Sequence, residues 1–280
     1  MKTNFLWPQT MLKRTLTLSL IAAALSSPTA YGTDAEKQRG YDIAARSDRS
    51  DRGFGDSLVS LKMVLRNAGG RETTRELRIS TLEIPDESVG DKSIIIFDSP
   101  RDVDGTALLS HARILKADQQ WLYLPALKRI KRISSVNKSG PFVGSEFAFE
   151  DFTSQELGKY DYRYLRSEPC GELQCDVVER YPRYEHSGYT RQVSWVDQSL
   201  FQVRKVDFYN RRDDLLKTLT FSDYRSYPVG NDGQTVWRTH RMEMVNHITG
   251  KSTDLIYGDY RFNNNLRDRD FVKSVLKRIR

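Results

Sequence analysis

The sequence predicts a mainly β protein built around one large antiparallel sheet. Apolar and polar residues alternate in many short segments, which is the period of a half-buried strand. Gly, Asp, Asn and Ser residues separate these segments at regular spacing, as in a meandering sheet or barrel. A sheet of about ten or more strands without a second set of core residues must curl or close. We therefore expect a curved sheet that leaves a concave apolar groove.

The first expected element is a signal peptide over residues 1–32. Two basic residues precede an uncharged run at 16–25, whose length suits a secretory signal, and small residues favour cleavage after Gly32. A membrane anchor would need roughly 20 apolar residues, so this run is too short to be one. Either Met1 or Met11 could be the true start. We expect an exported protein, most simply in a bacterial periplasm.

The mature chain, residues 33–280, is expected to form a single domain. Its length suits one large all-β domain or two small ones, and no linker or repeat divides it. The formal net charge of +7 falls by three when the signal peptide, with three basic and no acidic residues, is removed. Such a mild excess without a clustered basic binding motif argues against nucleic acid as a partner.

The structural elements are expected in the following order. Residues 35–46 favour a helix with Asp34 as its N-cap, and a charged loop at 46–53 should end it. Apolar residues then recur at every second position, which is the pattern of strands, and Gly69-Gly70 is expected to form a hairpin turn between two of them. The expected strands cover residues 59–66, 76–81, 93–97, 106–115, 120–124, 160–165, 176–181, 190–196, 201–209, 216–224, 236–245 and 252–260.

Two segments depart from the β pattern. Residues 150–157 favour a short helix or helical turn, with Asp151 as a capping residue. From Asp268 to the C-terminus, apolar residues recur at helical spacing, which predicts a helix that packs on the sheet.

The two cysteines, Cys170 and Cys175, are expected to form a disulfide. Export to an oxidising compartment favours this bond, and the short intervening loop with Gly171 suits a tight turn. The alternative is a redox or metal pair, but the spacing is not C-x-x-C and no other ligand lies nearby.

Nothing in the sequence argues for an enzyme, a cofactor or a metal site. Nucleophile-elbow, phosphate-loop and dinucleotide-binding motifs are absent. The adjacent Glu150 and Asp151 should point apart, so they are not expected to act as an acid–base pair. A hydrolase would need a nucleophile beside one of the four isolated histidines, which are His111, His186, His240 and His247.

The segment WLYLPALKRIKRI, residues 121–133, joins an apolar strand to a basic run. Trp121 and Tyr123 should share one face of the strand, and Leu122 and Leu124 the other. A strand that is apolar on both faces has to be covered on both. It therefore either packs inside the fold or has one face that lines a cavity.

The basic run allows three interpretations. Its cations could form a solvated face that blunts a sheet edge. They could instead attract lipid phosphates, at about 1 kcal/mol per basic residue near an anionic surface, or meet an acidic partner. The residues in question are Lys128, Arg129, Lys131 and Arg132.

Four ordered motifs, spread over about 55 residues, carry a resemblance to a known family. They are Phe97-x-x-Pro100, Asp102-Val103-x-Gly105-Thr106-x-Leu108-Leu109, WLYLPALKRIKRI, and Phe142-x-Gly144-Ser145-x-Phe147-x-x-Glu150-Asp151. In this order they resemble the outer-membrane lipoprotein-sorting protein family of the LolA-like superfamily. More narrowly, they are similar to the branch associated with RND/MMPL-type transporters.

The resemblance implies a strongly curved antiparallel sheet, an unclosed barrel with helices over its concave side. It also implies a periplasmic carrier for lipids or lipid-modified proteins that works with an inner-membrane RND-type transporter. The alternative is a non-enzymatic adaptor with a filled core and no lipid ligand. An acyl chain needs only apolar surface, which contributes about 0.8 kcal/mol per buried CH₂. The residues expected to line the groove are Phe97, Leu108, Leu122, Leu124, Phe142, Phe147, Phe149 and Phe152.

Overall fold

The computed structural model describes residues 1, 32–86, 88–114, 116–230 and 233–279. Nearly all of the predicted signal peptide lies outside the described residues, so that prediction stands untested. Gly32–Arg280 is one compact unit. Its described part contains one α-helix, α1 (Asp34–Asp51), and a 14-stranded antiparallel sheet. The predicted mainly β fold is therefore confirmed.

The strands carry most of the chain between α1 and the C-terminal tail. They are β1 (Asp56–Arg66), β2 (Glu72–Leu82), β3 (Val89–Ser99), β4 (Ala107–Arg113), β5 (Gln119–Leu124), β6 (Arg129–Ile133), β7 (Tyr160–Cys170), β8 (Leu173–Pro182), β9 (Tyr189–Asp197), β10 (Val203–Asn210), β11 (Leu215–Val229), β12 (Gln234–Asn246), β13 (Ser252–Tyr257) and β14 (Arg261–Phe262). Short 3₁₀ turns cover Pro125–Leu127, Ser135–Asn137, Phe149–Phe152, Leu157–Lys159, Asp268–Asp270 and Val275–Arg278.

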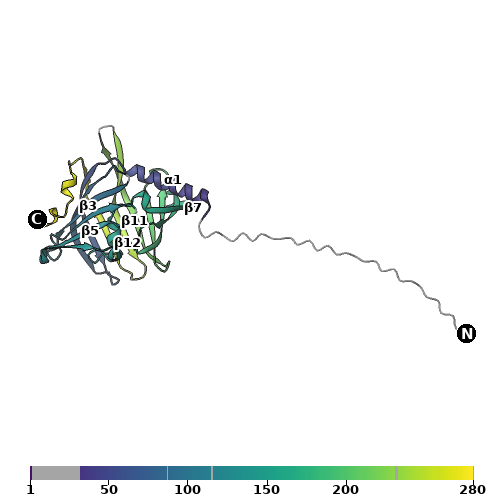
Figure 1. The fold of residues 1–280 in the computed structure, drawn as a ribbon, viewed down its shortest axis with the longest axis horizontal. Helices are drawn as coiled ribbons and strands as arrows, with labels where there is room; N and C mark the ends of the chain where they lie inside the picture. Colours follow the sequence, from purple (N-terminus) through teal and green to yellow (C-terminus); the bar gives the residue numbers. More distant parts are fainter. Residues whose placement is uncertain (2–31, 87, 115, 231–232, 280) are drawn as a thin grey trace. The chain divides into compact units, whose positions relative to one another are not determined.

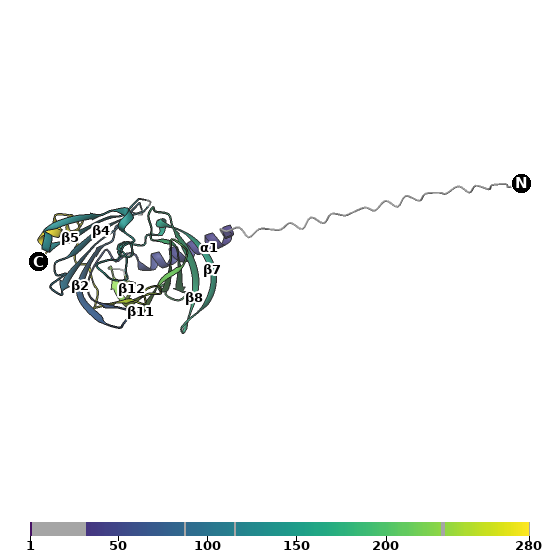
Figure 2. The same cartoon turned by 90° about the horizontal axis from the view of Figure 1, so that it is seen from below.

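The sheet consists of two meanders joined in the middle. Its order is β6-β5-β4-β3-β2-β1-β13-β12-β11-β10-β9-β8-β7, with β14 also paired to β1. The joining pair β1–β13 sets Leu61 opposite Tyr257. Figure 2 shows that the sheet curves strongly around its concave side. The outermost strands, β6 and β7, do not pair with each other in the described part, so the barrel remains unclosed as expected.

Helix α1 lies inside the curve of the sheet and packs against β7 (Figures 1 and 2). Its N-terminus has a capping box, in which Thr33 and Glu36 each bond the other's backbone N–H. Gly40 allows a close approach, because a Cβ there would lie 2.6 Å from the backbone nitrogen of Tyr164. The helix therefore sits near the sheet without an intervening layer of side chains at that point.

The predicted ends of α1 were wrong. Thr33, and not Asp34, is the N-cap, and the helix continues to Asp51 through most of the expected loop. Arg52 forms an ion pair with Asp48 at 2.6 Å, which is the i,i+4 spacing that stabilises a helix. The charges of this segment therefore support the last turn of the helix.

The two faces of the sheet bury different apolar clusters. On β4, Leu108 belongs to the large inner cluster, whereas Leu109 belongs to a second cluster with Phe271 and Leu276 of the C-terminal tail. Trp121 joins the second cluster, as expected for the strand face opposite Leu122. The tail covers the outer face near β3 and β5, at the yellow end of the ribbon (Figure 1).

Three local predictions need correction. The tail forms 3₁₀ turns rather than a longer helix, because only Phe271 and Leu276 are deeply buried to anchor it. The segment 150–157 is helical only near its two ends, in the turn Phe149–Phe152 and at Leu157. Asp151 caps the first of these turns from its third position, by accepting a hydrogen bond from the backbone N–H of Ala148, and is not the N-cap residue itself. The basic run was not assigned to a strand, yet it forms the edge strand β6.

Candidate ligand-binding cavity

Seven of the eight residues predicted to line a groove meet in one inner hydrophobic cluster. Phe142 is fully buried at its centre, with ring centroids 4.5 Å from Phe152 and 5.6 Å from Phe97. Phe147 lies 5.4 Å from Phe152. The other members of the seven are Leu108, Leu122 and Phe149, while Leu124 is half-buried at the end of β5. Side chains of this set therefore fill one part of the concave side by packing on one another.

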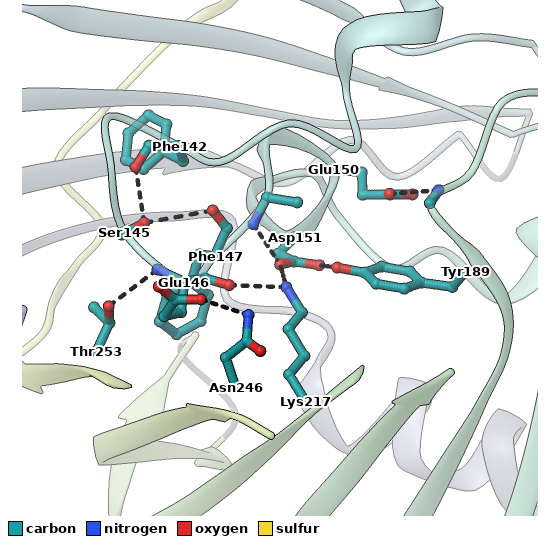
Figure 3. Close-up of polar contacts among 12 residues, drawn as sticks. Phe142, Ser145, Glu146, Phe147, Glu150, Asp151, Tyr189, Lys217, Asn246 and Thr253 are labelled. Atoms are coloured by element: carbon teal, nitrogen blue, oxygen red, sulfur yellow. Dashed lines mark hydrogen bonds and ion pairs between the residues drawn. The ribbon is translucent and has the colours of Figure 1, made fainter. Parts of the chain in front are cut away.

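Four of these phenylalanines come from residues 138–152, which we term the covering segment. Its backbone is tied to the far half of the sheet (Figure 3). Glu146 receives a 2.7 Å hydrogen bond from Asn246 and its backbone N–H donates to Thr253 at 3.0 Å. Lys217 of β11 donates to the backbone oxygen of Glu146 and forms a 2.7 Å ion pair with Asp151.

Glu150 and Asp151 point toward different partners, as Figure 3 shows. Asp151 also accepts a 2.8 Å hydrogen bond from the hydroxyl of Tyr189. Glu150 accepts from the backbone N–H of Gly188 and the hydroxyl of Ser187 at 2.8 and 2.9 Å. Burial, together with repulsion from Asp151, raises the pKa of Glu150. Both carboxylates thus hold the covering segment in place.

A buried charge cluster fixes the two ends of this region. Asp118, before β5, lies 3.1 Å from the Lys159 ammonium and 3.5 Å from that of Lys138. All three side chains are almost completely buried. Burial lowers the pKa of Lys138. The segment that links β6 to β7 is therefore anchored to the sheet at both ends.

A cavity of about 370 Å³ lies between α1 and the inner face of the sheet. Its apolar floor comes from strands β8 to β12, and its roof comes from α1 and residues 154–157. The floor residues include Val178, Val196, Val206, Phe221, Trp237 and Met242. None of the eight predicted lining residues contributes to this cavity.

Charged side chains surround part of the cavity. Arg52 bridges Asp48 and Glu156, at 2.6 and 3.1 Å, and Arg238 pairs with Asp51. Asp91 accepts a 2.8 Å hydrogen bond from the backbone N–H of Ile84. Burial first, and repulsion from Glu156 and Glu83 next, raise the pKa of Asp91 to about 7.

The deeper floor holds one hydroxyl without a partner. Ser194 of β9 lines the cavity and is 6% exposed. No hydrogen-bond partner for its Oγ lies among the described residues. An unpaired buried hydroxyl is costly unless a bound group satisfies it.

Sequence reasoning missed this cavity because its wall is assembled across many strands. The alternation within each strand shows which residues share a face, but not which face turns inward beneath α1. Two features of the sequence could have indicated this cavity. They are the apolar residues that share one face of the strands after residue 160, and the helix at the start of the domain.

The four basic residues occupy an exposed position. Lys128 follows the turn after β5, and Arg129, Lys131 and Arg132 lie on the edge strand β6. Within the described ranges, no ion pair joins any of them to a carboxylate. Their surroundings are those of a solvated sheet edge.

Other sequence-derived features also have defined positions. Cys170 and Cys175 are bonded and close the β7–β8 turn, as predicted. Across the described ranges, no group of three or more His, Cys, Asp or Glu side chains is arranged to hold a metal ion. Of the helices described, none has the length and apolar character needed for a bilayer span.

The unclosed, strongly curved antiparallel sheet, with a helix inside its concave side, defines a LolA-like fold. A LolA superfamily protein from Nitrosomonas europaea shares this fold, with a TM-score of 0.67 and 22% identity over 84% of this chain and 98% of that chain. At this identity the likeness concerns the fold alone.

Two more similar structures identify the family. A domain from Vibrio parahaemolyticus, named as an outer membrane lipoprotein-sorting protein domain, is 49% identical over 86% of this chain and 99% of that chain, with a TM-score of 0.81. A DUF1329 family protein from Desulfovibrio piger is 30% identical with the same coverage and a TM-score of 0.78. The chain therefore belongs to the outer-membrane lipoprotein-sorting protein family.

A family model described as an uncharacterized protein matches residues 90–278. No protein of curated function matches this chain.

Proposed function

We propose that this protein is a periplasmic carrier or binding protein for lipids or lipid-modified proteins, and that it acts by binding rather than by catalysis. The observation that carries the proposal is the cavity beneath α1, with its apolar floor of Val, Phe, Trp and Met side chains. Burial of an acyl chain there would contribute about 0.8 kcal/mol per CH₂. Family membership supports the same role, since a similar domain is named for lipoprotein sorting.

The size of the cavity suits a small ligand. At about 370 Å³ it lies toward the lower end of the roughly 300–1,000 Å³ typical of small-molecule sites. One acyl chain is therefore a better match than a bulky multi-chain lipid held entirely inside.

The eight predicted groove residues remain part of the proposal as an extension of the site. Phe142, Phe147 and Phe152 already fill their region, so a ligand would contact them only after the covering segment moved. Lys217 and Asp118 resist such a movement, because both are paired and buried where they hold the segment.

The same aromatic packing favours a second candidate, a non-enzymatic adaptor with a filled core. Mass spectrometry of the protein purified from a membrane-containing extract separates the two. If the protein is a carrier, an acyl lipid should co-purify with it, and the refolded protein should bind an acylated probe. If no lipid co-purifies and no probe binds, the adaptor is the better description.

The export, partner and membrane assignments are also proposals. Cleavage after Gly32, measured by mass spectrometry of the mature N-terminus, would support a periplasmic location. An inner-membrane RND-type transporter is the proposed partner on the strength of the sequence resemblance, and crosslinking followed by identification of the captured membrane protein tests it.

The exposed basic run is the proposed contact with a membrane or partner. Reversing the charge of Lys128, Arg129, Lys131 and Arg132 should abolish binding to anionic liposomes at low salt, because the attraction is electrostatic. Unchanged liposome binding would leave these cations as a solvated, protected sheet edge.

A further inference from the structure

The charge of the cavity wall is opposite in sign to that of the chain. Five carboxylates line the cavity against three guanidinium groups, whereas the whole chain carries a net charge of +7. The carboxylates are those of Asp48, Asp51, Glu83, Asp91 and Glu156. Because a low-dielectric wall focuses such a field, the cavity should attract cations and repel anions.

The carboxylates differ in how well the protein satisfies them. Asp48 and Glu156 share Arg52, while Glu83 accepts hydrogen bonds from the backbone N–H groups of Gly53 and Gly55 at 2.8 Å. These contacts fix the positions of three acidic groups around one part of the wall.

Asp91 is the least compensated of the set. Its carboxylate forms no ion pair within the described ranges and accepts a hydrogen bond from the backbone of Ile84. Its pKa is raised because burial and the neighbouring Glu156 and Glu83 disfavour its negative charge more than the Ile84 hydrogen bond and the nearby Arg52 favour it. A ligand cation placed beside Asp91 would relieve this repulsion.

Ser194 supplies an independent indication of a ligand. Its hydroxyl lies in the cavity wall, is more than nine-tenths buried, and has no partner in the described part of the chain. It stands among apolar floor residues such as Val178 and Val196, so it could bond to a polar group within an otherwise apolar ligand.

From the cavity, the acidic wall and Ser194 together, we infer that the preferred ligand is a single-chain amphiphile with an ammonium headgroup. The chain lies on the floor formed by strands β8 to β12, and the ammonium group faces Asp91, Glu83 and Glu156. The hydroxyl of Ser194 hydrogen-bonds to a polar group of the ligand. This inference rests on the proposed function, because it assigns the headgroup class for the same cavity.

Three probes with one chain length test the assignment: dodecylammonium, dodecyl maltoside and dodecyl sulfate. Each is titrated into the full mature protein at pH 8, below its micellar concentration, and binding is followed by calorimetry. We expect dodecylammonium to bind about tenfold or more tightly than dodecyl sulfate, with the neutral maltoside between them. High salt should narrow the difference.

Substitutions locate the effect. Asp91→Asn keeps an acceptor for the Ile84 N–H while removing the charge, so it should weaken dodecylammonium binding about threefold to tenfold and leave dodecyl maltoside unchanged. Glu172→Gln, on the exposed β7–β8 turn, is the matched control and should change neither.

The outcomes separate the two levels of the proposal. Equal binding of all three probes, or tighter binding of dodecyl sulfate, would overturn the ammonium assignment but keep the apolar site. Binding of none of them would overturn the proposed acyl-binding function itself. The inference requires that Asp91→Asn binds dodecylammonium more weakly than the parent while Glu172→Gln does not, with folding of both variants verified by circular dichroism.

Discussion

Removal of the Lys217 charge should loosen the covering segment and destabilise the fold. The Lys217 ammonium is 2.7 Å from Asp151 and also donates to the backbone oxygen of Glu146, and both members of the ion pair are buried. Lys217→Met would leave the Asp151 carboxylate buried without its cation. Loss of one partner of a buried pair typically costs 3–5 kcal/mol.

The structure places the expected cost near the lower limit of that range. Asp151 would keep its hydrogen bonds from Tyr189 and from the backbone of Ala148. We therefore expect a loss of about 3 kcal/mol in the free energy of unfolding. For a domain of this size, each kcal/mol lowers Tm by about 2–4 °C, so Tm should fall by about 6–12 °C.

Thermal and urea unfolding, followed by circular dichroism, measure this effect. Lys37→Met is the matched control, because Lys37 pairs with Asp34 on the exposed surface of α1 and such pairs contribute little. The double variant Lys217→Met with Asp151→Asn should recover part of the loss, since it removes both buried charges. A loss no greater than that of the Lys37 control would refute the anchoring role assigned to Lys217.

Three further predictions concern stability. The pKa of Asp91 rises from 3.8 in the unfolded chain to about 7 in the fold. Between about pH 4 and 7 the unfolded chain loses this proton while the folded chain keeps it, so the unfolding free energy should fall by up to about 4 kcal/mol as the pH rises. Urea unfolding of Asp91→Asn should lack this pH dependence, and an unchanged profile would contradict the assignment. Ser194→Ala should raise the unfolding free energy of the ligand-free protein by about 1 kcal/mol, because it removes an unpaired buried hydroxyl; a lower Tm would show that the hydroxyl is satisfied. Replacing Cys170 and Cys175 by Ser should lower the unfolding free energy by about 2 kcal/mol, as the loop-entropy relation gives for so short a loop. A Tm equal to that of the parent would argue against a stabilising disulfide.

Local patterns in the sequence predicted much of the sheet but not its junction. Strand alternation is a property of neighbouring residues, so β1, β9 and β11 could be recognised from sequence. The pairing of β1 with β13 joins residues almost two hundred positions apart, and no local pattern specifies it. The opposite faces of Trp121 and Leu122 could be predicted, because successive residues of a strand always alternate.

The basic edge strand shows where composition misleads. Arg129–Ile133 is rich in cations, which obscures its strand character, yet Ile130 packs in the outer cluster and Ile133 is buried. Pairing with β5 decides its conformation, and the cations then lie at an edge, where they discourage unwanted pairing.

The sequence predicts that the site is an apolar groove, but not where in the fold the cavity lies. Phe142, Phe147, Phe149 and Phe152 are predicted to line a groove, and in the structure they pack in the inner cluster. Whether such residues line a space or fill it depends on how the covering segment folds back. The cavity instead forms between α1 and strands β8 to β12. Its width depends on how closely α1 approaches the sheet, as in the contact of Gly40 with β7.

Filling the cavity beneath α1 measures most directly whether an acyl chain binds there. Ala44 faces the cavity, so Ala44→Trp should fill it, whereas Ala35 lies on the exposed side of the same helix and Ala35→Trp is the matched control. Fluorescence titration with a labelled, uncharged monoacylglycerol should give one site per protein in the parent and in Ala35→Trp. Ala44→Trp should lose this binding while remaining folded. Equal binding by both tryptophan variants would contradict it.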